Sequence, residues 1–419
     1  MRLMIRAVGL IALLTAAMSA HAGGTAVSPE LMALQEVIRS IERGEFGIPA
    51  EERQRTIEGA IAFFTPYPSG NGRACATCHV PADGYSLSPA TVQARWQRLQ
   101  DRRRTNPAAD DPLFRSIDAD DGRDDYTLLR TRALVKVRVP LPSRVRLTDT
   151  PEVTHVTLSR AVPPLSMLEH TAPYQQDRSM STLEAQARAA IDAHLQPGSP
   201  PSDAYVSSLV YFERRLFATE GARRIAAALR DARPAPDVDP PLDALERRGK
   251  ERFDELCARC HGGAAQVRNE ENRIFPPFDG STNPASINVG ISNPLPKGLT
   301  TQIIHGTAFD LPTQRYTVDL PHGGSVLLES SDPGTVLTDV EALETVGGNQ
   351  VFNRFDIPQL RGINRTAPYF HDHRAQTLEE VVRHYQRFFH FINTVRGFPL
   401  PLIADEDIDP IVAYMRKAL

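Results

Sequence analysis

The chain has 419 residues, with 47 basic and 51 acidic side chains, and 41% of its residues are hydrophobic. This composition excludes a disordered tail, a collagen-like rod and a polytopic membrane protein. The net charge of −4 leaves no basic footprint of the kind that binds nucleic acid, so we expect no nucleic-acid partner. Because domains usually hold about 100–200 residues, the length predicts two or three domains.

The first 22 residues have the pattern of a secretory signal peptide. Arg2 and Arg6 accompany an apolar run over residues 7–17, and Ala20-His21-Ala22 forms a small-x-small cleavage site. An uncleaved membrane anchor is the alternative, but the run is short for a bilayer span of about 20 residues. We therefore expect Sec-dependent export to the periplasm, and no membrane span in the mature chain.

Apolar periodicity and capping residues predict a series of helices. Their approximate ranges are 28–44, 55–64, 88–104, 181–195, 202–217 and 243–257. Alternating apolar residues predict short strands, at 135–139, 145–147 and 153–158, and a hairpin over 316–328. The proline-rich stretch 233–241 indicates a linker between two domains.

The chain contains two copies of the motif Cys-x-x-Cys-His, which use all of its cysteines. The residues are Cys75, Cys78 and His79 in the first copy, and Cys257, Cys260 and His261 in the second. This motif is the attachment sequence of c-type haem. The two thiols add to the two vinyl groups of the porphyrin, and the adjacent imidazole becomes the proximal ligand of the iron. We therefore expect two covalently bound haems.

Three other interpretations compete with haem attachment. Disulfides are compatible with an exported chain, but they do not require the histidine. A zinc site built from all four thiolates is disfavoured, because the two pairs lie 182 residues apart. A thioredoxin-like redox pair needs a βαβ context that the sequence does not show. Two complete copies of the motif favour haem over all three.

An internal repeat connects the two halves of the chain. Thr171-Ala172-Pro173-Tyr174 recurs 195 residues later as Thr366-Ala367-Pro368-Tyr369. Each copy leads into a predicted helix with a capping-box start, at Ser181 and at Thr377. Since each half has one haem motif and one such helix, we expect this helix to cover the distal face of the haem.

Two stretches of the second half are distinctive. They are Arg365-Thr366-Ala367-Pro368-Tyr369-Phe370-His371-Asp372 and Thr377-Leu378-Glu379-Glu380-Val381-Val382-Arg383-His384-Tyr385. Together with both haem motifs, both repeat copies and the Ser331-Asp332-Pro333-Gly334 turn, they resemble the bacterial dihaem cytochrome c peroxidase and MauG family. The resemblance is weak over residues 101–159, which we interpret as an insertion.

The resemblance implies a mainly α-helical protein, with two cytochrome c-like haem domains, irregular loops and a few short β-strands. We place the N-terminal haem domain at 23–235 and the C-terminal one at 236–419. In the family, the N-terminal haem is the open peroxidatic centre and the C-terminal haem is an electron reservoir. The implied activity is that of a peroxidase-type haem oxidoreductase. The implied partners are hydrogen peroxide, a small electron-donor protein (a cytochrome c or a cupredoxin) and a second copy in a homodimer.

Tyr385 falls where the family places the second axial ligand of the C-terminal haem iron, a methionine in the peroxidases and a tyrosine in MauG. The neighbouring His384 is one alternative, and a tyrosine that only packs in the core is another. In the first repeat copy the same position is Ala190, which has no donor atom. We therefore expect an open sixth position on the N-terminal haem iron.

Two residues are candidates for catalysis beside that open position. Gln186 matches the distal glutamine of the family, whereas the distal glutamate position falls on Gln196. Peroxide cleavage needs a group that takes up a proton and returns it, and a neutral histidine, His194, lies two residues earlier. The alternative for His194 is an ordinary histidine on a helix surface.

Two further family features are incomplete. The tryptophan that links the two haems in the family falls on Gln176, and Trp96, the only tryptophan, is at no matching position. Thr366 and Pro368 match residues that bind calcium through backbone carbonyls. The matching asparagine position is Ala161, which lacks a side-chain oxygen, so calcium is the weaker expectation.

The sequence leaves two other functions open. A dihaem electron carrier without peroxidase activity would need both irons six-coordinate. A dioxygen-using dihaem oxygenase would, like a peroxidase, use one open iron. Ala190 favours an enzyme over a carrier, because it leaves one position of the N-terminal iron without a ligand.

Overall fold

The computed structural model describes residues 28–268, 286–292, 311–320, 323–337, 353–396 and 401–419. The expected signal peptide, residues 1–22, lies outside the described residues. Within them, no helix is both long and apolar enough to cross a bilayer. The chain folds into a mainly helical structure with a few short strands, which confirms the predicted fold class.

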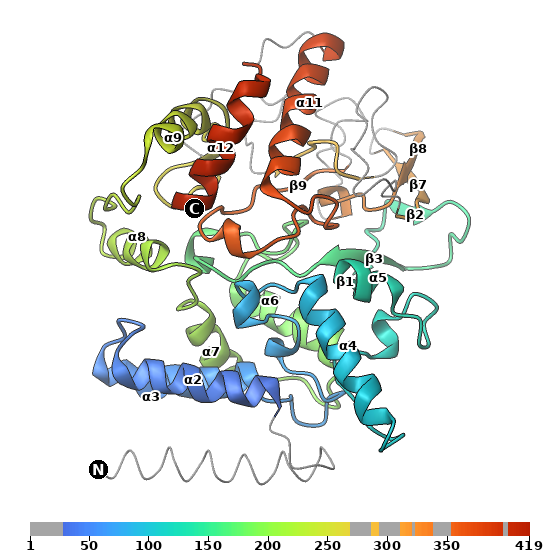
Figure 1. Cartoon of the computed structure of the whole chain (residues 1–419). Helices are drawn as coiled ribbons and strands as arrows, with labels where there is room; N and C mark the ends of the chain where they lie inside the picture. Colours follow the sequence, from blue (N-terminus) through green and yellow to red (C-terminus); the bar gives the residue numbers. More distant parts are fainter. Residues whose placement is uncertain (1–27, 269–285, 293–310, 321–322, 338–352, 397–400) are drawn as a thin grey trace.

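The helices and strands follow one another along the chain with irregular connections. The helices are α2 (Pro29–Arg43), α3 (Arg53–Phe64), α4 (Pro89–Arg103), α5 (Thr127–Arg132), α6 (Leu183–Ala190), α7 (Asp203–Glu213), α8 (Glu220–Arg230), α9 (Ala244–Leu256), α11 (Leu378–Arg396) and α12 (Asp405–Ala418). The strands are β1 (Leu134–Pro140), β2 (Val145–Leu147), β3 (His155–Ala161), β4 (His261–Gly262), β5 (Val267–Arg268), β6 (Ser286–Ile287), β7 (Gln314–Asp319), β8 (Ser325–Ser330) and β9 (Phe355–Asp356). In Figure 1, α2 and α3 lie at the bottom, α11 and α12 lie at the top, and β1 and β3 lie between them.

Capping residues set the helix starts. The hydroxyl of Ser28 caps α2, and Gly44 ends this helix in the left-handed conformation, as predicted. The predicted start of α6 is wrong by one residue. Thr182 rather than Ser181 is the N-cap, because its hydroxyl accepts the N–H of Ala185 at 3.1 Å.

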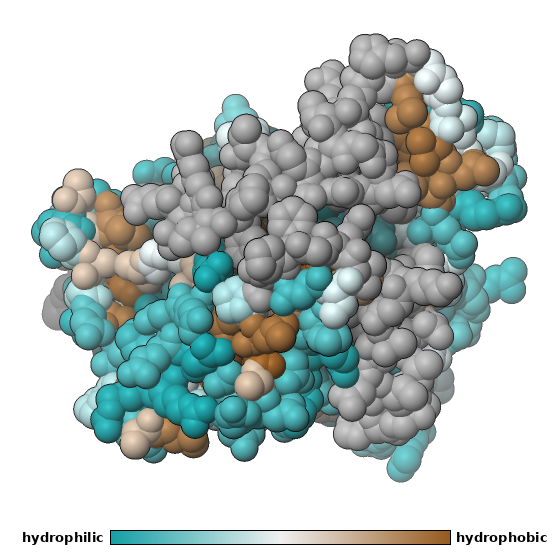
Figure 2. Space-filling model, turned by 90° about the horizontal axis from the view of Figure 1, so that it is seen from above, coloured by the Kyte–Doolittle hydropathy of each residue, from teal (hydrophilic) through white to brown (hydrophobic). Residues whose placement is uncertain are grey.

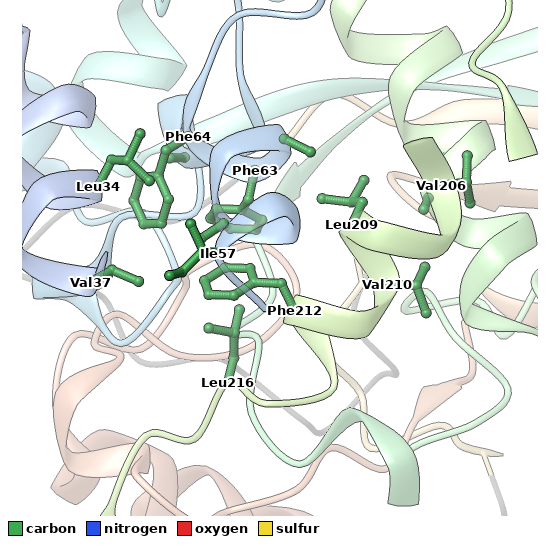
Figure 3. Packing of buried hydrophobic residues seen from close by; sticks show 14 of the residues in the cluster. Leu34, Val37, Ile57, Phe63, Phe64, Val206, Leu209, Val210, Phe212 and Leu216 are labelled. Carbon is green, nitrogen blue, oxygen red and sulfur yellow. The ribbon is translucent and has the colours of Figure 1, made fainter. Parts of the chain in front are cut away.

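Each half of the chain has its own hydrophobic core. The first core joins α2, α3, α6 and α7 around Phe63, Phe64 and Phe212 (Figure 3). The second joins α9, α11 and α12 around Phe253 and Tyr414. Each core thus surrounds a helix pair that is far apart in sequence, α3 with α7 and α9 with α12.

A glycine allows each of these helix pairs to pack closely. A Cβ on Gly59 of α3 would lie 2.1 Å from the carbonyl oxygen of Ser208 on α7. A Cβ on Gly249 of α9 would lie 1.9 Å from the carbonyl oxygen of Pro410 on α12. Any other residue would push the two backbones apart, so the crossings depend on these two glycines.

Short strands pair within the inserted segment and connect it to the C-terminal half. β1 and β3 form an antiparallel pair, with Leu134 opposite Ala161. β2 pairs instead with β7, so that Arg146 lies opposite Thr317, and β7 pairs with β8 as predicted for the hairpin. The sheet β2–β7–β8 therefore joins residues 101–159 to the C-terminal half.

Buried ion pairs fix the inserted segment against the first Cys-x-x-Cys-His motif. Arg73, two residues before Cys75, lies 2.6 Å from a carboxylate oxygen of Asp118. Arg95 of α4 lies 2.5 Å from a carboxylate oxygen of Asp111. All four of these charged side chains are buried. Because an unpaired buried charge is costly, each pair holds its part of the segment in place.

The internal repeat of the sequence is also a repeat in space. The backbones of Tyr174 and Tyr369 each bridge to the residue six positions later. Each phenol donates a hydrogen bond to the carbonyl six positions earlier, at 3.1 and 3.2 Å. The peptide bonds before Pro173 and Pro368 are both cis. The two copies therefore form the same turn.

The end of β3 lies between the two turns. The N–H of Ala161 donates to the carbonyl of His371 at 2.6 Å, and its carbonyl accepts from the side-chain amide of Gln176 at 3.1 Å. Gln176 and His371 occupy the same position in the two repeat copies, 195 residues apart. One residue of the strand thus holds both turns together.

The preceding residue, Arg160, adds a buried charge network at the same place. Its Nη1 lies 2.6 Å from Asp177 of the first repeat copy, and its Nε lies 2.6 Å from Asp332 in the turn 331–334. All three side chains are at most 3% exposed. Burial alone would raise the pKa of Asp177, but the charge of Arg160 holds this pKa below its ordinary value.

Exposed large hydrophobic side chains are scattered. Among the described residues they are Met32, Val153, Leu229, Leu245, Leu327 and Leu402. Figure 2 shows the hydrophobic residues of one face in small separate groups among hydrophilic ones. This surface does not test the expected homodimer, which stays a prediction.

Removing Arg160 should destabilise the protein strongly. Arg160→Ala removes the guanidinium that bonds to both Asp177 and Asp332 in the interior, and breaking a buried ion pair in this way costs about 3–5 kcal/mol. Arg146→Ala is the control, because its ion pair with Asp319 is partly exposed and contributes about 1 kcal/mol or less. Denaturant unfolding followed by circular dichroism measures both values. Equal losses in the two variants would contradict the role of Arg160.

Candidate functional site

An internal cavity of about 450 Å³ contacts both halves of the chain. Its wall includes every residue of the two motifs that the sequence singles out: Cys75, Cys78, His79, Cys257, Cys260 and His261. Most of the remaining wall consists of apolar side chains. The fold therefore brings together, at one cavity, two motifs that lie 182 residues apart in the chain.

The first motif begins in a 3-10 turn, Cys75–Thr77, that packs against α3. The ring Nδ1 of His79 lies 2.9 Å from the carbonyl oxygen of Tyr85. Nδ1 donates to this carbonyl, and Nε2 then carries the lone pair. Burial lowers the pKa of His79 to about 4, with the carbonyls of Tyr85 and Pro163 acting in the opposite direction. The ring is therefore neutral at neutral pH.

The second motif follows α9 directly and repeats this arrangement. The N–H of Cys257 donates to the carbonyl of Phe253 at 2.7 Å, as in a continuing helix. The Nδ1 of His261 lies 2.9 Å from the carbonyl oxygen of Pro358, and burial lowers the pKa of His261 to about 4. A backbone carbonyl on Nδ1 is the usual support for a histidine that binds metal through Nε2.

The residues at each motif fit an attached porphyrin. None of the four cysteines forms a disulfide. Among the described residues, no group of three or more His, Cys, Asp or Glu side chains is placed to hold a metal ion. What each motif offers is two thiols, one neutral imidazole with Nε2 available, and an apolar cavity, which are the requirements of haem c.

The helix α6 and the π-helical turn after it, Ile191–Leu195, form one wall of the cavity. Gln186, Ala190 and His194 all contribute to this wall. Their spacing of four residues places them on one helical face. At the position equivalent to Tyr385, the first half therefore presents a methyl group to the cavity, as the sequence predicts.

The structure places His194 at the cavity and leaves Gln196 away from it. His194 is half-buried, and burial lowers the pKa of its ring. The charges of Asp118 and Arg73 have smaller effects, since Asp118 raises this pKa and Arg73 lowers it. Gln196 is exposed and has a left-handed backbone, with φ of 48°. Its side-chain oxygen accepts from the amide of Asn71 at 3.1 Å. Of the two residues, His194 is the one that can reach a molecule in the cavity.

On α11, Tyr385 lines the cavity and His384 does not. The Nε2 of His384 lies 2.8 Å from the carbonyl oxygen of Val289, and the side chain is buried. Burial raises the pKa of the Tyr385 phenol, so that it stays protonated unless a cation such as ferric iron lies beside it. Of these two residues, Tyr385 is the one whose side chain can reach a molecule in the cavity.

Two residues that the sequence analysis gave no role meet at the cavity. The rings of Phe355 and His371 stack with centroids 3.9 Å apart and planes 18° apart. Neither ring nitrogen of His371 has a hydrogen-bond partner among the described residues, although the side chain is buried. The repeat register could have identified His371, because it pairs this residue with Gln176, which also lines the cavity.

The sequence analysis also missed Glu213, the last residue of α7. Its side chain lines the cavity and is 5% exposed. The helical spacing could have identified Glu213, because Leu209 lies four residues earlier and therefore on the same face of the helix. A carboxylate on an otherwise apolar helix face indicates a role other than packing in the core.

The residues expected to bind calcium lie at the same cavity. Thr366 and Pro368 line it, and the hydroxyl of Thr366 donates to the carbonyl of Ile363 at 3.2 Å. Ala161 uses its backbone to hold the two repeat turns. No contact in the structure tests calcium binding, which stays a prediction. Trp96 packs against Phe114 and does not line the cavity.

Comparison with known proteins gives structural neighbours only. No family model and no curated protein matches the sequence. A MauG-like protein associated with microbial copper homeostasis is 16% identical, with 88% of this chain and 91% of that chain covered and a TM-score of 0.44. The diheme peroxidase BthA from Burkholderia thailandensis E264 is 14% identical, with 87% and 86% covered and a TM-score of 0.43.

This chain is similar to MauG-like and diheme peroxidase structures. A hydrazine synthase from Kuenenia stuttgartiensis is a further neighbour, 15% identical, with 79% of this chain and 93% of that chain covered and a TM-score of 0.34. The functional argument rests on the cavity of this chain.

Proposed function

We propose that this protein is a periplasmic dihaem c-type cytochrome that reduces or uses hydrogen peroxide. One asymmetry carries the proposal. Both Cys-x-x-Cys-His motifs line one cavity, but the second half supplies a potential axial ligand, Tyr385, where the first half has Ala190. An iron with an open position can bind peroxide, whereas a six-coordinate iron is suited to storing an electron.

In this proposal, residues 23–235 form the N-terminal haem domain and residues 236–419 the C-terminal one. The two separate cores and the coil before α9 support this division. The cysteines of each motif would hold one porphyrin by thioether bonds, and His79 and His261 would bind the two irons. When bound, the two haems supply the redox chemistry, since each iron exchanges one electron and the open one binds peroxide.

The chain's own residues move the proton and orient the substrate. His194 is neutral because burial lowers its pKa, so it can take a proton from bound peroxide and return it to the leaving oxygen. Gln186 lies on the same helical face and offers an amide N–H to a peroxide oxygen. The apolar side chains around them exclude water from the reaction.

Location and partners follow from the sequence. The signal-peptide pattern of residues 1–22 supports periplasmic export. The electrons would come from a small donor protein, a cytochrome c or a cupredoxin, as the family resemblance implies. No nucleic-acid partner is part of the proposal.

The purified protein should contain two haems per chain. Its ferric form should give one high-spin and one low-spin paramagnetic-resonance signal, because only one iron has a second axial ligand. It should also consume hydrogen peroxide with a reduced small cytochrome as donor. Two low-spin signals would favour the electron carrier, and turnover with dioxygen in place of peroxide would favour the oxygenase. A single haem, or none, would refute the proposal.

Replacing His194 should slow peroxide turnover while both haems remain attached. General acid–base catalysis contributes roughly 10²–10⁴-fold, so His194→Ala should lower kcat/KM by about that factor. In the wild type, activity should fall as pH drops below the lowered pKa of His194, and the variant should lack this acidic limb. His155→Ala is the control, since His155 lies at the start of β3 outside the cavity. Equal rates in both variants would remove His194 from the mechanism.

Replacing Tyr385 should change the low-spin signal of the C-terminal haem. Tyr385→Phe removes the phenol oxygen but keeps the ring, so the ferric spectrum should shift and the reduction potential should rise. His384→Gln is the matched variant, because the amide can still bond to the carbonyl of Val289. A spectrum that responds to His384→Gln and not to Tyr385→Phe would assign the ligand to His384.

A further inference from the structure

Glu213 is a buried carboxyl on the cavity wall with no evident partner. Its side chain is 5% exposed, and its Oε2 has no hydrogen-bond partner among the described residues. Burying an ionised carboxylate without a counter-charge is costly, and such a group takes up a proton instead. The position of Glu213 at the end of α7 therefore places a proton-binding group on the cavity.

In the second half of the chain, the position equivalent to Glu213 is occupied by Met415. Phe212 of α7 packs against Gly59 of α3, and Tyr414 of α12 packs against Gly249 of α9. These two aromatic residues lie 202 positions apart, so the residues that follow them, Glu213 and Met415, correspond. Met415 is also buried and also lines the cavity. One fold position thus carries a titratable group in the first half and a thioether in the second.

The surroundings of Glu213 favour its protonated form. The titratable groups that face it from the packed elements are Glu184 on α6, Tyr174 in the turn before α6, Cys75 in the first motif and Tyr205 on α7. Each of these four is neutral or negative. The adjacent Arg214 is paired with Glu184 at 3.0 Å. Burial, with an added effect of the Glu184 charge, raises the pKa of Glu213 to about 8.

We propose that Glu213 takes up a proton when the N-terminal haem is reduced, and that Met415 leaves the C-terminal haem without such a group. This inference rests on the proposed function, which supplies the haem and the reduced donor protein. At a pH above the pKa of Glu213 in the ferric protein, one electron from the donor converts ferric to ferrous iron and one proton from solvent binds the Glu213 carboxylate, so the net charge of the site is unchanged. Reduction removes one positive charge from the cavity, which raises the proton affinity of Glu213.

The proton uptake has a use in the proposed reaction. Reduction of one hydrogen peroxide to two waters consumes two electrons and two protons. Glu213 stores one of these protons in the cavity at the time when the first electron arrives. The pairing of electron and proton avoids a build-up of negative charge in an apolar site, where unpaired charge is costly.

The reduction potential of the N-terminal haem should therefore depend on pH. At low pH, Glu213 is protonated in both redox states and the potential is constant. Between the pKa of Glu213 in the ferric protein and its higher pKa in the ferrous protein, the potential falls as pH rises. The slope approaches ~59 mV per pH unit. One pH unit is a tenfold change in proton concentration, and a tenfold change in an equilibrium constant shifts the potential of a one-electron couple by ~59 mV.

Spectroelectrochemical titration of the full-length holoprotein over a series of pH values tests the proposal. Glu213→Gln should retain both haems and lose the slope at the N-terminal haem, while the C-terminal haem behaves as in the wild type. Glu213→Met, which copies the second half of the chain, should give the same result and replaces Glu213→Gln if that variant loses haem. Glu184→Gln is the control. This variant should keep the slope, but the pH range over which the potential falls should move to lower pH. Without the negative charge of Glu184, the pKa of Glu213 is lower.

The outcomes separate this inference from the function on which it rests. A slope that persists in both Glu213 variants would overturn the role of Glu213. A wild-type protein with two haems and no pH dependence of either potential would overturn that role alone. A wild-type protein without two haems would overturn the proposed function first.

Discussion

The buried guanidinium of Arg160 is the contact on which the arrangement of the two halves depends. It lies between Asp177 of the first half and Asp332 of the second, where little solvent is available to stabilise an unpaired charge. The next residue, Ala161, hydrogen-bonds to both repeat turns. A single strand end therefore sets how the two turns face each other, and with them the walls of the cavity that both motifs share.

Elements with local signals were predictable from the sequence. Ser28 and Asp243 cap their helices through their own side chains, so the starts of α2 and α9 are visible in a few residues. The pairing of β2 with β7 was not predictable, because it joins residues about 170 positions apart whose contact no local pattern specifies. The site also contains residues that the sequence predicts and contacts that it does not predict. The motif cysteines and histidines are visible in their spacing, and Tyr385 and His194 are expected from the family resemblance. The stacking of Phe355 on His371 depends on which loops meet in space.

The two halves use one scaffold for different chemistry by changing a few side chains. Corresponding positions hold Ala190 and Tyr385 on a helix of the cavity wall, and Glu213 and Met415 at the helix crossing. In each pair the first half keeps an open or titratable position, and the second half closes it or makes it apolar. The two halves also differ in backbone, because α6 passes into a π-helical turn after Ala190 whereas α11 continues as an α-helix to Arg396.

The ion pairs behind the first motif also constrain how this part of the protein opens. Arg73 and Arg95 fasten the inserted segment directly against the residues that carry Cys75 and Cys78. The inserted segment can leave the first motif only if both buried pairs break, and each broken pair leaves an uncompensated charge in the interior. The segment and the residues around Cys75 and Cys78 therefore form one cooperative unit, which opens as a whole or not at all.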